Sequence, residues 1–146
     1  MKKIEIENSL NDELEKQLNI LAAYFEKTDD VNETSSSLER SEEWFKKFSN
    51  NHKEHNIYAY YIKSVGVWEL FYLGQTHSDY SIQRMRQHLI KASKTTNSKL
   101  AELKNIDELG FKSIIIEPQE LRHYFEIMLI QKLKPDHKNL SNKLLK

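Results

Sequence analysis

The chain has 146 residues and no cysteine, so its length predicts one domain with a modest core, and its composition excludes disulfides and thiolate metal sites. The longest apolar run, residues 20–25, is far shorter than the roughly 20 residues that span a bilayer, and the N-terminal sequence MKKIEIENS lacks the apolar stretch of a secretory signal. We therefore expect a cytoplasmic protein that has no membrane partner.

The formal net charge of zero hides an asymmetry between the two parts of the chain. Residues 1–55 carry 8 Lys and Arg against 13 Asp and Glu, a net charge of −5, whereas residues 56–146 carry 14 against 9, a net charge of +5. A basic C-terminal part suits a polyanionic partner, and an acidic N-terminal part argues against nucleic acid covering the whole surface. Charge alone does not distinguish such a partner from ordinary solvated lysines.

Residues 8–27 have the pattern of an amphipathic helix, with Ser9 as its cap. Its apolar stripe recurs at spacings of four and three residues and consists of Leu10, Leu14, Leu18, Leu21 and Phe25. Such a stripe either packs on its own domain or contacts a second copy of the chain, and the second option predicts a homodimer through the N-terminal helix.

A polar linker, residues 28–37, separates this helix from a second one. The second helix is predicted over residues 38–48 and should direct four apolar side chains to the core, namely Leu38, Trp44, Phe45 and Phe48. A polar loop, residues 50–55, follows.

Residues 56–76, NIYAYYIKSVGVWELFYLGQT, have the composition of a β-hairpin. Two runs rich in aromatic and β-branched residues are separated by a glycine-containing break at residues 64–66. Alternation along the first run places Tyr58 and Tyr60 on one face of the strand, and Ile57, Ala59 and Tyr61 on the other.

A further helix is predicted over residues 78–93, because polar start signals cluster at residues 78–81. Its apolar face consists of Ile82, Met85, Leu89 and Ala92. A neighbouring stripe carries Arg84, His88 and Lys91, with Arg84 and His88 one turn apart. A guanidinium and an imidazole in this arrangement can address one phosphate together, although the same spacing also occurs among ordinary surface residues.

The remaining chain is predicted to contain a loop, a short helix, a strand and a long helix. Residues 93–97 form the loop, residues 99–106 the short helix, and residues 111–117, FKSIIIE, a central strand. Pro118 suits the first turn of a helix that continues to Leu133, and Pro135 marks its end.

Glu126 lies within the apolar face of that last helix, between Leu133 and Ile130 when successive residues are placed about 100° apart. An ionised carboxylate on an apolar face is costly unless it is paired, protonated or bound to a metal. Two interpretations stay open at this point: Glu126 is a metal ligand, or it is one half of an ion pair with His123 or with an arginine elsewhere.

Three groups of residues, in this order, resemble the motifs of the GIY-YIG nuclease family. The hairpin supplies Ile57-Tyr58 and Tyr72-Leu73-Gly74, the following helix supplies Arg84 and His88, and the last helix supplies Glu126-x-x-Leu129-Ile130, followed by Lys134-Pro135 and Asn139. The resemblance covers residues 56–139. It departs from the family at two positions, where Asn56 replaces the first glycine and Leu73 replaces isoleucine.

The resemblance implies an α+β fold, in which a small antiparallel sheet (the hairpin plus a third strand at residues 111–117) is flanked by helices. The nuclease-like domain would comprise residues 56–146, and residues 1–55 would form an N-terminal helical extension.

The resemblance also implies hydrolysis of DNA phosphodiester bonds with Mg²⁺ or Mn²⁺. Glu126 would hold the metal, Arg84 would grip the scissile phosphate, and Tyr72 would hydrogen-bond in the same cluster. Either Tyr58 or His88 would be the general base, since the pKa of tyrosine is about 10 and that of histidine is closer to neutral. Gly74 and Asn139 would support the site. The contacts to DNA, a duplex above all, would come from Arg84, Arg86 and Lys91.

Two other functions stay open. One is a nucleic-acid-binding module that keeps the fold without catalysis, and the other is a small interaction protein built on the N-terminal helix. Within the nuclease interpretation, we expect a compact restriction-like or phage or mobile-element enzyme. The target, and whether one or both strands are cut, cannot be inferred from the residues.

Overall fold

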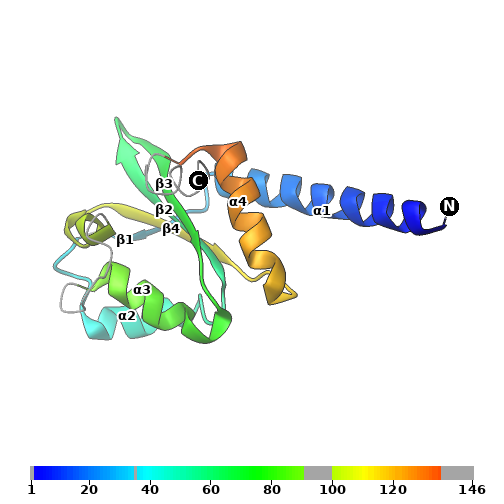
Figure 1. Ribbon diagram of the computed structural model, residues 1–146. Coiled ribbons are helices and arrows are strands. Elements are labelled where there is room, and N and C mark those ends of the chain that lie inside the picture. The colour runs from blue at the N-terminus through cyan, green and yellow to red at the C-terminus, as the bar shows by residue number, and fades with distance from the viewer. Residues whose placement is uncertain (1, 35, 91–99, 136–146) are drawn as a thin grey trace.

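The computed structural model describes residues 2–34, 36–90 and 100–135, and it has an α+β fold (Figure 1). An antiparallel sheet has the strand order β1-β4-β2-β3. The strands are β1 (Asn32–Thr34), β2 (Ile57–Ser64), β3 (Val67–Gln75) and β4 (Leu109–Ile114). The helices are α1 (Lys2–Glu26), α2 (Glu42–Ser49), α3 (Ser81–Leu89) and α4 (Arg122–Leu133), with short 3-10 turns at Ser78–Tyr80, Leu100–Asn105 and Gln119–Leu121. The predicted fold class is confirmed.

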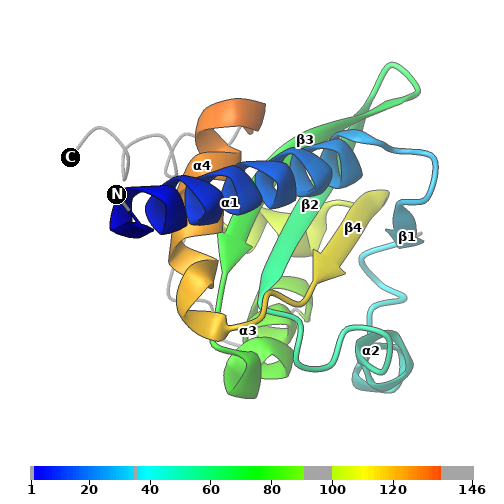
Figure 2. The ribbon, with the colours of Figure 1, turned by 90° about the vertical axis from the view of Figure 1, so that its right-hand side faces the viewer.

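The sheet separates two layers of helices (Figures 1 and 2). α1 lies across one face, where the phenol of Tyr61 donates a hydrogen bond to the carbonyl of Phe25. α2 and α3 cover the other face, on which the centroids of the Phe48 and Phe111 rings are 5.1 Å apart. α4 runs beside β3 and contacts α1. The hairpin therefore has one face toward α1 and the other toward α3.

The predicted hairpin is confirmed, with β2 paired to β3 and an irregularity of register between Tyr60 and Tyr61. Its turn places Val65 at φ +49° and Gly66 at φ +77°. Successive residues with positive φ match the right-handed twist of the two strands, and glycine adopts this conformation without a steric penalty.

β4 is an interior strand, as predicted, because it pairs with β2 on one side and with β1 on the other. It ends at Ile114, three residues earlier than the predicted strand. β1 was not predicted, and it lies within the segment that was expected to be a linker. Its three residues pair with Leu109, Gly110 and Phe111, and a strand this short has no periodic pattern of its own.

The N-terminal helices differ from the prediction in three details. α1 begins before residue 8, so Ser9 lies inside the helix and does not cap it. α2 begins at Glu42, after Ser41 accepts a hydrogen bond from the Trp44 amide. Leu38 therefore precedes the helix and is 84 % exposed, whereas the predicted aromatic residues of α2 do pack against the core.

The apolar stripe of α1 belongs mainly to the molecule's own core, where Leu18 and Phe25 are buried. Leu10, nearer the projecting end of the helix, is 59 % exposed (Figure 1). A homodimer contact through α1 stays a prediction. In the part of the chain that is described, no helix has both the length and the apolar character needed to cross a membrane.

α3 is shorter than predicted, because it ends at Leu89 and Ile90 has extended dihedral angles. Ile90 is 3 % exposed and so joins the core as the first residue after the helix. The predicted positions of Lys91, Ala92, the loop at 93–97 and Asn139 lie outside the described residues. α4 ends at Leu133, as predicted, and Lys134 before Pro135 is in the left-handed conformation. The helix begins at Arg122 and not at Pro118, because a 3-10 turn occupies Gln119–Leu121.

A buried lysine in β4 ties the end of α1 to the sheet. The Lys112 ammonium donates to the carbonyl oxygens of Tyr24 and Lys27, each at 2.6 Å, and pairs with Asp30 at 2.6 Å. Its side chain is 1 % exposed. A cation at the C-terminal end of a helix is favoured by the helix dipole and satisfies carbonyls that have no partner inside the helix. The pKa of Asp30 is lowered, chiefly by its hydrogen bond with Lys112.

Candidate active site

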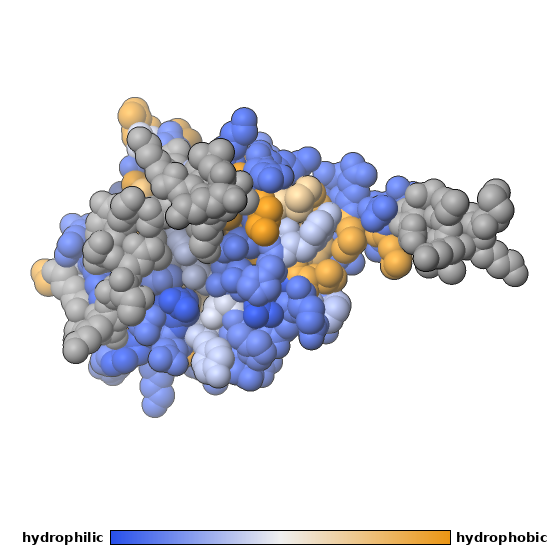
Figure 3. All heavy atoms as spheres, in the orientation of Figure 1, coloured by the Kyte–Doolittle hydropathy of each residue, from blue (hydrophilic) through white to orange (hydrophobic). Residues whose placement is uncertain are grey.

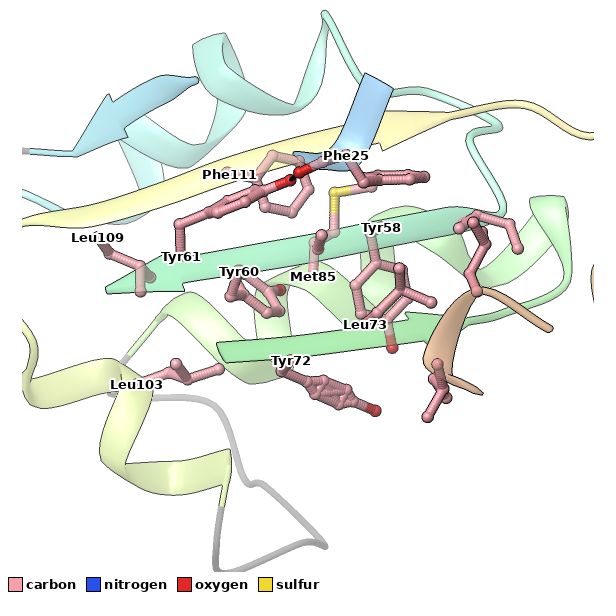
Figure 4. Packing of buried hydrophobic residues seen from close by; sticks show 14 of the residues in the cluster. Phe25, Tyr58, Tyr60, Tyr61, Tyr72, Leu73, Met85, Leu103, Leu109 and Phe111 are labelled. Carbon is pink, nitrogen blue, oxygen red and sulfur yellow. Dashed lines mark hydrogen bonds between the residues drawn. The ribbon is translucent and has the colours of Figure 1, made fainter. Parts of the chain in front are cut away.

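Three buried tyrosines gather on the hairpin face that is directed toward α3. Tyr58 and Tyr60 belong to β2 and Tyr72 to β3, and the register places Tyr58 opposite Gly74 and Tyr60 opposite Tyr72. The rings of Tyr58 and Tyr72 are stacked with centroids 6.0 Å apart, and those of Tyr58 and Tyr60 are 5.8 Å apart. Figure 4 shows these three rings on one side of the hairpin and Tyr61 on the other, as the alternation predicted.

Gly74 leaves the space in which two phenols meet. A Cβ at this position would lie 2.8 Å from the hydroxyl oxygen of Tyr72 and 3.0 Å from that of Tyr58. A methyl group does not fit at these distances in a close-packed interior, so any larger residue would displace the phenols. The glycine is therefore needed for the convergence of the two hydroxyl groups.

Burial raises the pKa of each tyrosine in this cluster above its usual value of about 10, and for Tyr58 and Tyr60 the pKa is raised well above it. The positive charge of Arg84 opposes this effect at Tyr58 and Tyr72. The phenols are consequently protonated at neutral pH unless further positive charge arrives.

His88 lies beneath this cluster and is 3 % exposed. Its Nδ1 is 3.0 Å from the hydroxyl oxygen of Tyr60. Burial lowers the pKa of His88 to about 3, and the charges of Arg84 and Lys104 act in the same direction. His88 was predicted on a stripe beside the apolar face of the helix, but it is buried within that face. Because His88 follows Met85 by three residues, it shares the buried face of the helix.

Arg84 and Glu126 approach the tyrosines from two different helices. Arg84 is an exposed residue of α3 whose charge lowers the pKa of Tyr58, Tyr72 and His88. Glu126 belongs to α4, is 5 % exposed, and raises the pKa of Tyr72 through its negative charge. The five residues predicted for catalysis therefore lie in one region, although they come from four separate elements, β2, β3, α3 and α4.

A single buried carboxylate fits the kind of cation that the resemblance implies. Within the described ranges, no group of three or more His, Asp or Glu side chains is placed to hold a metal ion. Mg²⁺ usually keeps several waters and binds through one or two carboxylates together with substrate phosphates. Glu126 at the edge of the tyrosine cluster is compatible with that mode of binding and not with a closed cage of protein ligands.

Of the interpretations left open for Glu126, an ion pair with His123 is not formed. His123 is exposed, and none of the ion pairs among the described residues includes it. Arg86, which was predicted to contact DNA, forms an exposed ion pair with Glu42 of α2, with Nε donating to Oε2 at 3.0 Å. Its charge is thus already shared with a carboxylate.

Asn56, at the position of the family's first glycine, extends the pairing of β2 with β4. Its Nδ2 donates to the carbonyl of Ile116 at 2.9 Å, and its Oδ1 accepts from the amide of Ile116 at 2.7 Å. The fully buried side-chain amide thus makes the two hydrogen bonds that a peptide group would make.

Sequence reasoning missed Tyr60 as a partner of His88, and it missed Arg122 at the start of α4. Alternation placed Tyr60 on the correct face but gave no reason to connect it with a residue 28 positions later. Arg122 hydrogen-bonds to Gln75 at the end of β3, a contact for which consecutive residues hold no signal.

Comparison of the chain with protein-family models, with curated proteins and with solved structures gives no match. Function must therefore be inferred from the residues and their geometry.

Proposed function

We propose that this protein is a divalent-metal-dependent endonuclease of the GIY-YIG type that hydrolyses phosphodiester bonds of DNA. The observation that carries this proposal is the convergence of one set of side chains from the hairpin, α3 and α4, namely Tyr58, Tyr72, Arg84, His88 and Glu126. They supply the hydrogen bonds, the cation and the carboxylate that phosphoryl transfer requires.

Arg84 binds the scissile phosphate. Its guanidinium is exposed, and no carboxylate of the described residues pairs with it. A planar fork of N–H donors matches two oxygens of a phosphate. Because the charge of Arg84 also lowers the pKa of Tyr58 and Tyr72, the same group both holds the substrate and makes the phenols more acidic.

Tyr58 accepts the proton of the attacking water as a phenolate, after its own proton has passed to solvent, and Tyr72 would hydrogen-bond in the same cluster. Burial raises the pKa of Tyr58 well above 10, so this role requires the positive charge that arrives with the substrate and cation. His88 is the weaker base, because its pKa is lowered to about 3 and its Nδ1 faces Tyr60. It positions the Tyr60 ring against Tyr58.

Glu126 would hold Mg²⁺ or Mn²⁺ at the side of Tyr72. When bound, such a cation supplies neutralisation of charge on the phosphate and on the leaving oxygen. The contribution of Glu126 itself is a negative charge that α4 holds almost fully buried, beside a phenol whose pKa it raises. The carboxylate therefore also keeps Tyr72 a hydrogen-bond donor until positive charge offsets it.

Incubation with duplex, branched and single-stranded DNA, in Mg²⁺, in Mn²⁺ and in EDTA, tests this proposal. We expect metal-dependent cleavage of at least one substrate, with defined ends. DNA binding without cleavage in either metal would indicate the non-catalytic binding module instead. A chain that binds none of the three substrates would favour an interaction protein built on α1.

A further inference from the structure

A polar hollow of about 410 Å³ lies beside the tyrosine cluster, where the end of β3 and the starts of α3 and α4 come together. This side of the molecule is predominantly hydrophilic (Figure 3). The side chains that matter for its chemistry are Gln75, His77, Gln87, Arg84 and Arg122. Two guanidinium groups thus line one hollow, and none of the described residues that line it is acidic.

Arg122 is held in place by neutral partners. Its Nε donates to Oε1 of Gln75 at 2.9 Å, and its Nη1 donates to the carbonyl of Gln119 at 3.0 Å. The Gln119 side chain in turn accepts a hydrogen bond from the amide of Ser78 at 2.6 Å. These bonds fix the orientation of the guanidinium, but no carboxylate of the described residues pairs with it. An oriented guanidinium that keeps its charge can bind an anion with little further ordering.

Arg84 reaches the same hollow from α3, and it too lacks a carboxylate partner among the described residues. Two like charges that line one hollow repel each other. An anion between or beside them relieves this repulsion and gains charge-assisted hydrogen bonds.

The two arginines have equivalent places on their helices. Arg84 precedes His88 by one turn of α3, and Arg122 precedes Glu126 by one turn of α4. In both pairs the arginine lines the hollow, and the second residue is buried nearer the tyrosines. The hollow therefore shares Arg84 with the candidate active site, and Arg122 gives it a second cationic position.

We propose that this hollow is a phosphate-binding site, in which Arg122 clamps the backbone phosphate next to the one that Arg84 holds. That the phosphate belongs to DNA rests on the proposed function, whereas the affinity of the hollow for phosphate does not. Arg122 is thus a substrate-positioning residue, and the protein requires at least two consecutive phosphates of one strand.

The test compares Arg122→Gln with Lys132→Gln in the full-length protein without metal. Lys132 is an exposed residue of the same helix that does not line the hollow, so both variants remove one positive charge from α4. Inorganic phosphate and pyrophosphate are titrated while the arginine Nε–H signals are followed by NMR. A short duplex is then titrated by fluorescence anisotropy at several salt concentrations in EDTA.

We expect phosphate to shift the Arg122 signal in the unmodified protein. Arg122→Gln should weaken DNA binding about tenfold and flatten the dependence of log affinity on log salt by about one unit, whereas Lys132→Gln should bind like the unmodified protein. Arg122→Lys keeps the charge without the fork and should fall between the two. It also replaces Arg122→Gln if that variant does not fold.

The outcomes separate this inference from the proposed nuclease activity. If DNA is cleaved but Arg122→Gln binds DNA and phosphate as Lys132→Gln does, the phosphate site is overturned and the nuclease stands. If no DNA is cleaved but Arg122→Gln alone loses phosphate and DNA binding, the site stands and the nuclease falls. Binding of free phosphate without any DNA binding would overturn the assignment to a nucleic-acid backbone.

Discussion

The two faces of the central hairpin both bury tyrosines and charged groups, but they use them differently. On the face toward α1, the Tyr61 phenol donates to the carbonyl of Phe25, and the Lys112 ammonium has three oxygen partners. Both of these polar side chains are bonded within the protein. The result is a fixed junction between helix and sheet.

On the face toward α3, the phenols of Tyr58 and Tyr72 converge above Gly74, close to the exposed charge of Arg84 and the buried charge of Glu126. The charge of Arg84 has no acidic partner among the described residues. A buried tyrosine is thus no sign of function by itself. We assign the proposed function to the face where the exposed charge of Arg84 lies beside an open hollow.

On the face toward α3, Glu126→Gln should give the largest loss of cleavage. It keeps the size and hydrogen-bonding capacity of the side chain but removes the charge that would hold a cation, so we expect cleavage to fall at least about 1,000-fold with little change in melting temperature. Cleavage assays and metal-free thermal melts measure the two effects. If the carboxylate instead serves a structural ion pair, stability should fall by about 3–5 kcal/mol and metal-dependent turnover should survive, which would contradict its assignment to the site.

Acid should destabilise the α3 face through its buried histidines. Burial lowers the pKa of His88 to about 3 and that of His52, which shares the Ser113 hydroxyl with His55, to about 4. Histidine in an unfolded chain has a pKa of about 6.5. Below that pH, His52 and His88 bind protons in the unfolded chain but not in the folded chain. This part of the stability is complete above about pH 6.5 and is lost progressively as the pH falls toward 3.

Urea unfolding at pH 7.5 and at pH 4.5 should differ by a few kcal/mol, since each unit of pKa difference corresponds to about 1.4 kcal/mol. His52→Gln is neutral throughout this range and should reduce the difference. The exposed residue His123 gives the matched control, His123→Gln. Equal pH dependence in the two variants would show that burial of His52 does not contribute.

Lys112→Met should lower stability and leave cleavage unchanged, which is the reverse of the effects expected for Glu126→Gln. It removes the partner of two carbonyl oxygens and of Asp30 while roughly keeping the volume of the side chain. We expect a loss of about 3 kcal/mol of stability and unchanged cleavage per folded molecule. Chemical denaturation combined with an assay below the unfolding transition measures both. A variant that is stable but inactive would break the distinction between the two faces.

Gly74→Ala should give a smaller loss of cleavage rate than Glu126→Gln. Compared with Gly66→Ala, it separates the effect of displaced phenols from the effect of lower stability. The new methyl group would displace two phenol hydroxyls, and a shift of about 1 Å in a catalytic group costs about 100-fold in rate. Gly66→Ala is the matched control: no atom lies near its Cβ, but its φ of +77° strains the new residue. The control should lose about 1–2 kcal/mol of stability and keep its rate, whereas equal rates in both variants would argue against a role for the two phenols.

The fold could be predicted where its signals lie in neighbouring residues. The hairpin has a glycine-containing turn between two aromatic and β-branched runs, and the helices have apolar stripes at helical spacing, so the existence of these elements follows from local patterns. Their boundaries follow less well, because α1 begins earlier than predicted, α2 and α4 begin later, and α3 ends earlier. The faces of Tyr58 and Tyr60 also follow from local patterns. Contacts between distant segments carry no such signal, which is why β1 was missed.

The candidate site was predicted only in part, for the same reason. His88 is one helical turn from the exposed residue Arg84 and also one turn from the buried residue Met85. The sequence alone is compatible with either face of the helix, and the packing against the sheet shows that His88 is buried. Arg122 and Lys112 were not singled out, because the residues beside them in the sequence do not reveal a hollow or a helix end. Both depend on partners at least three residues away, and the carbonyl partners of Lys112 are 85 and 88 residues away.

The attachment of Lys112 to α1 also determines how the N-terminal helix can change during evolution. Two of its three partners are backbone carbonyls. The contact between β4 and the helix therefore depends on where the helix ends more than on the side chains of the helix. Substitutions along the exposed surface of α1 leave this contact intact. An insertion or deletion near Tyr24 or Lys27, by contrast, would rotate the carbonyls away from a buried ammonium. The register of the helix end relative to residue 112 should therefore tolerate less change than the side chains on the exposed surface of the helix.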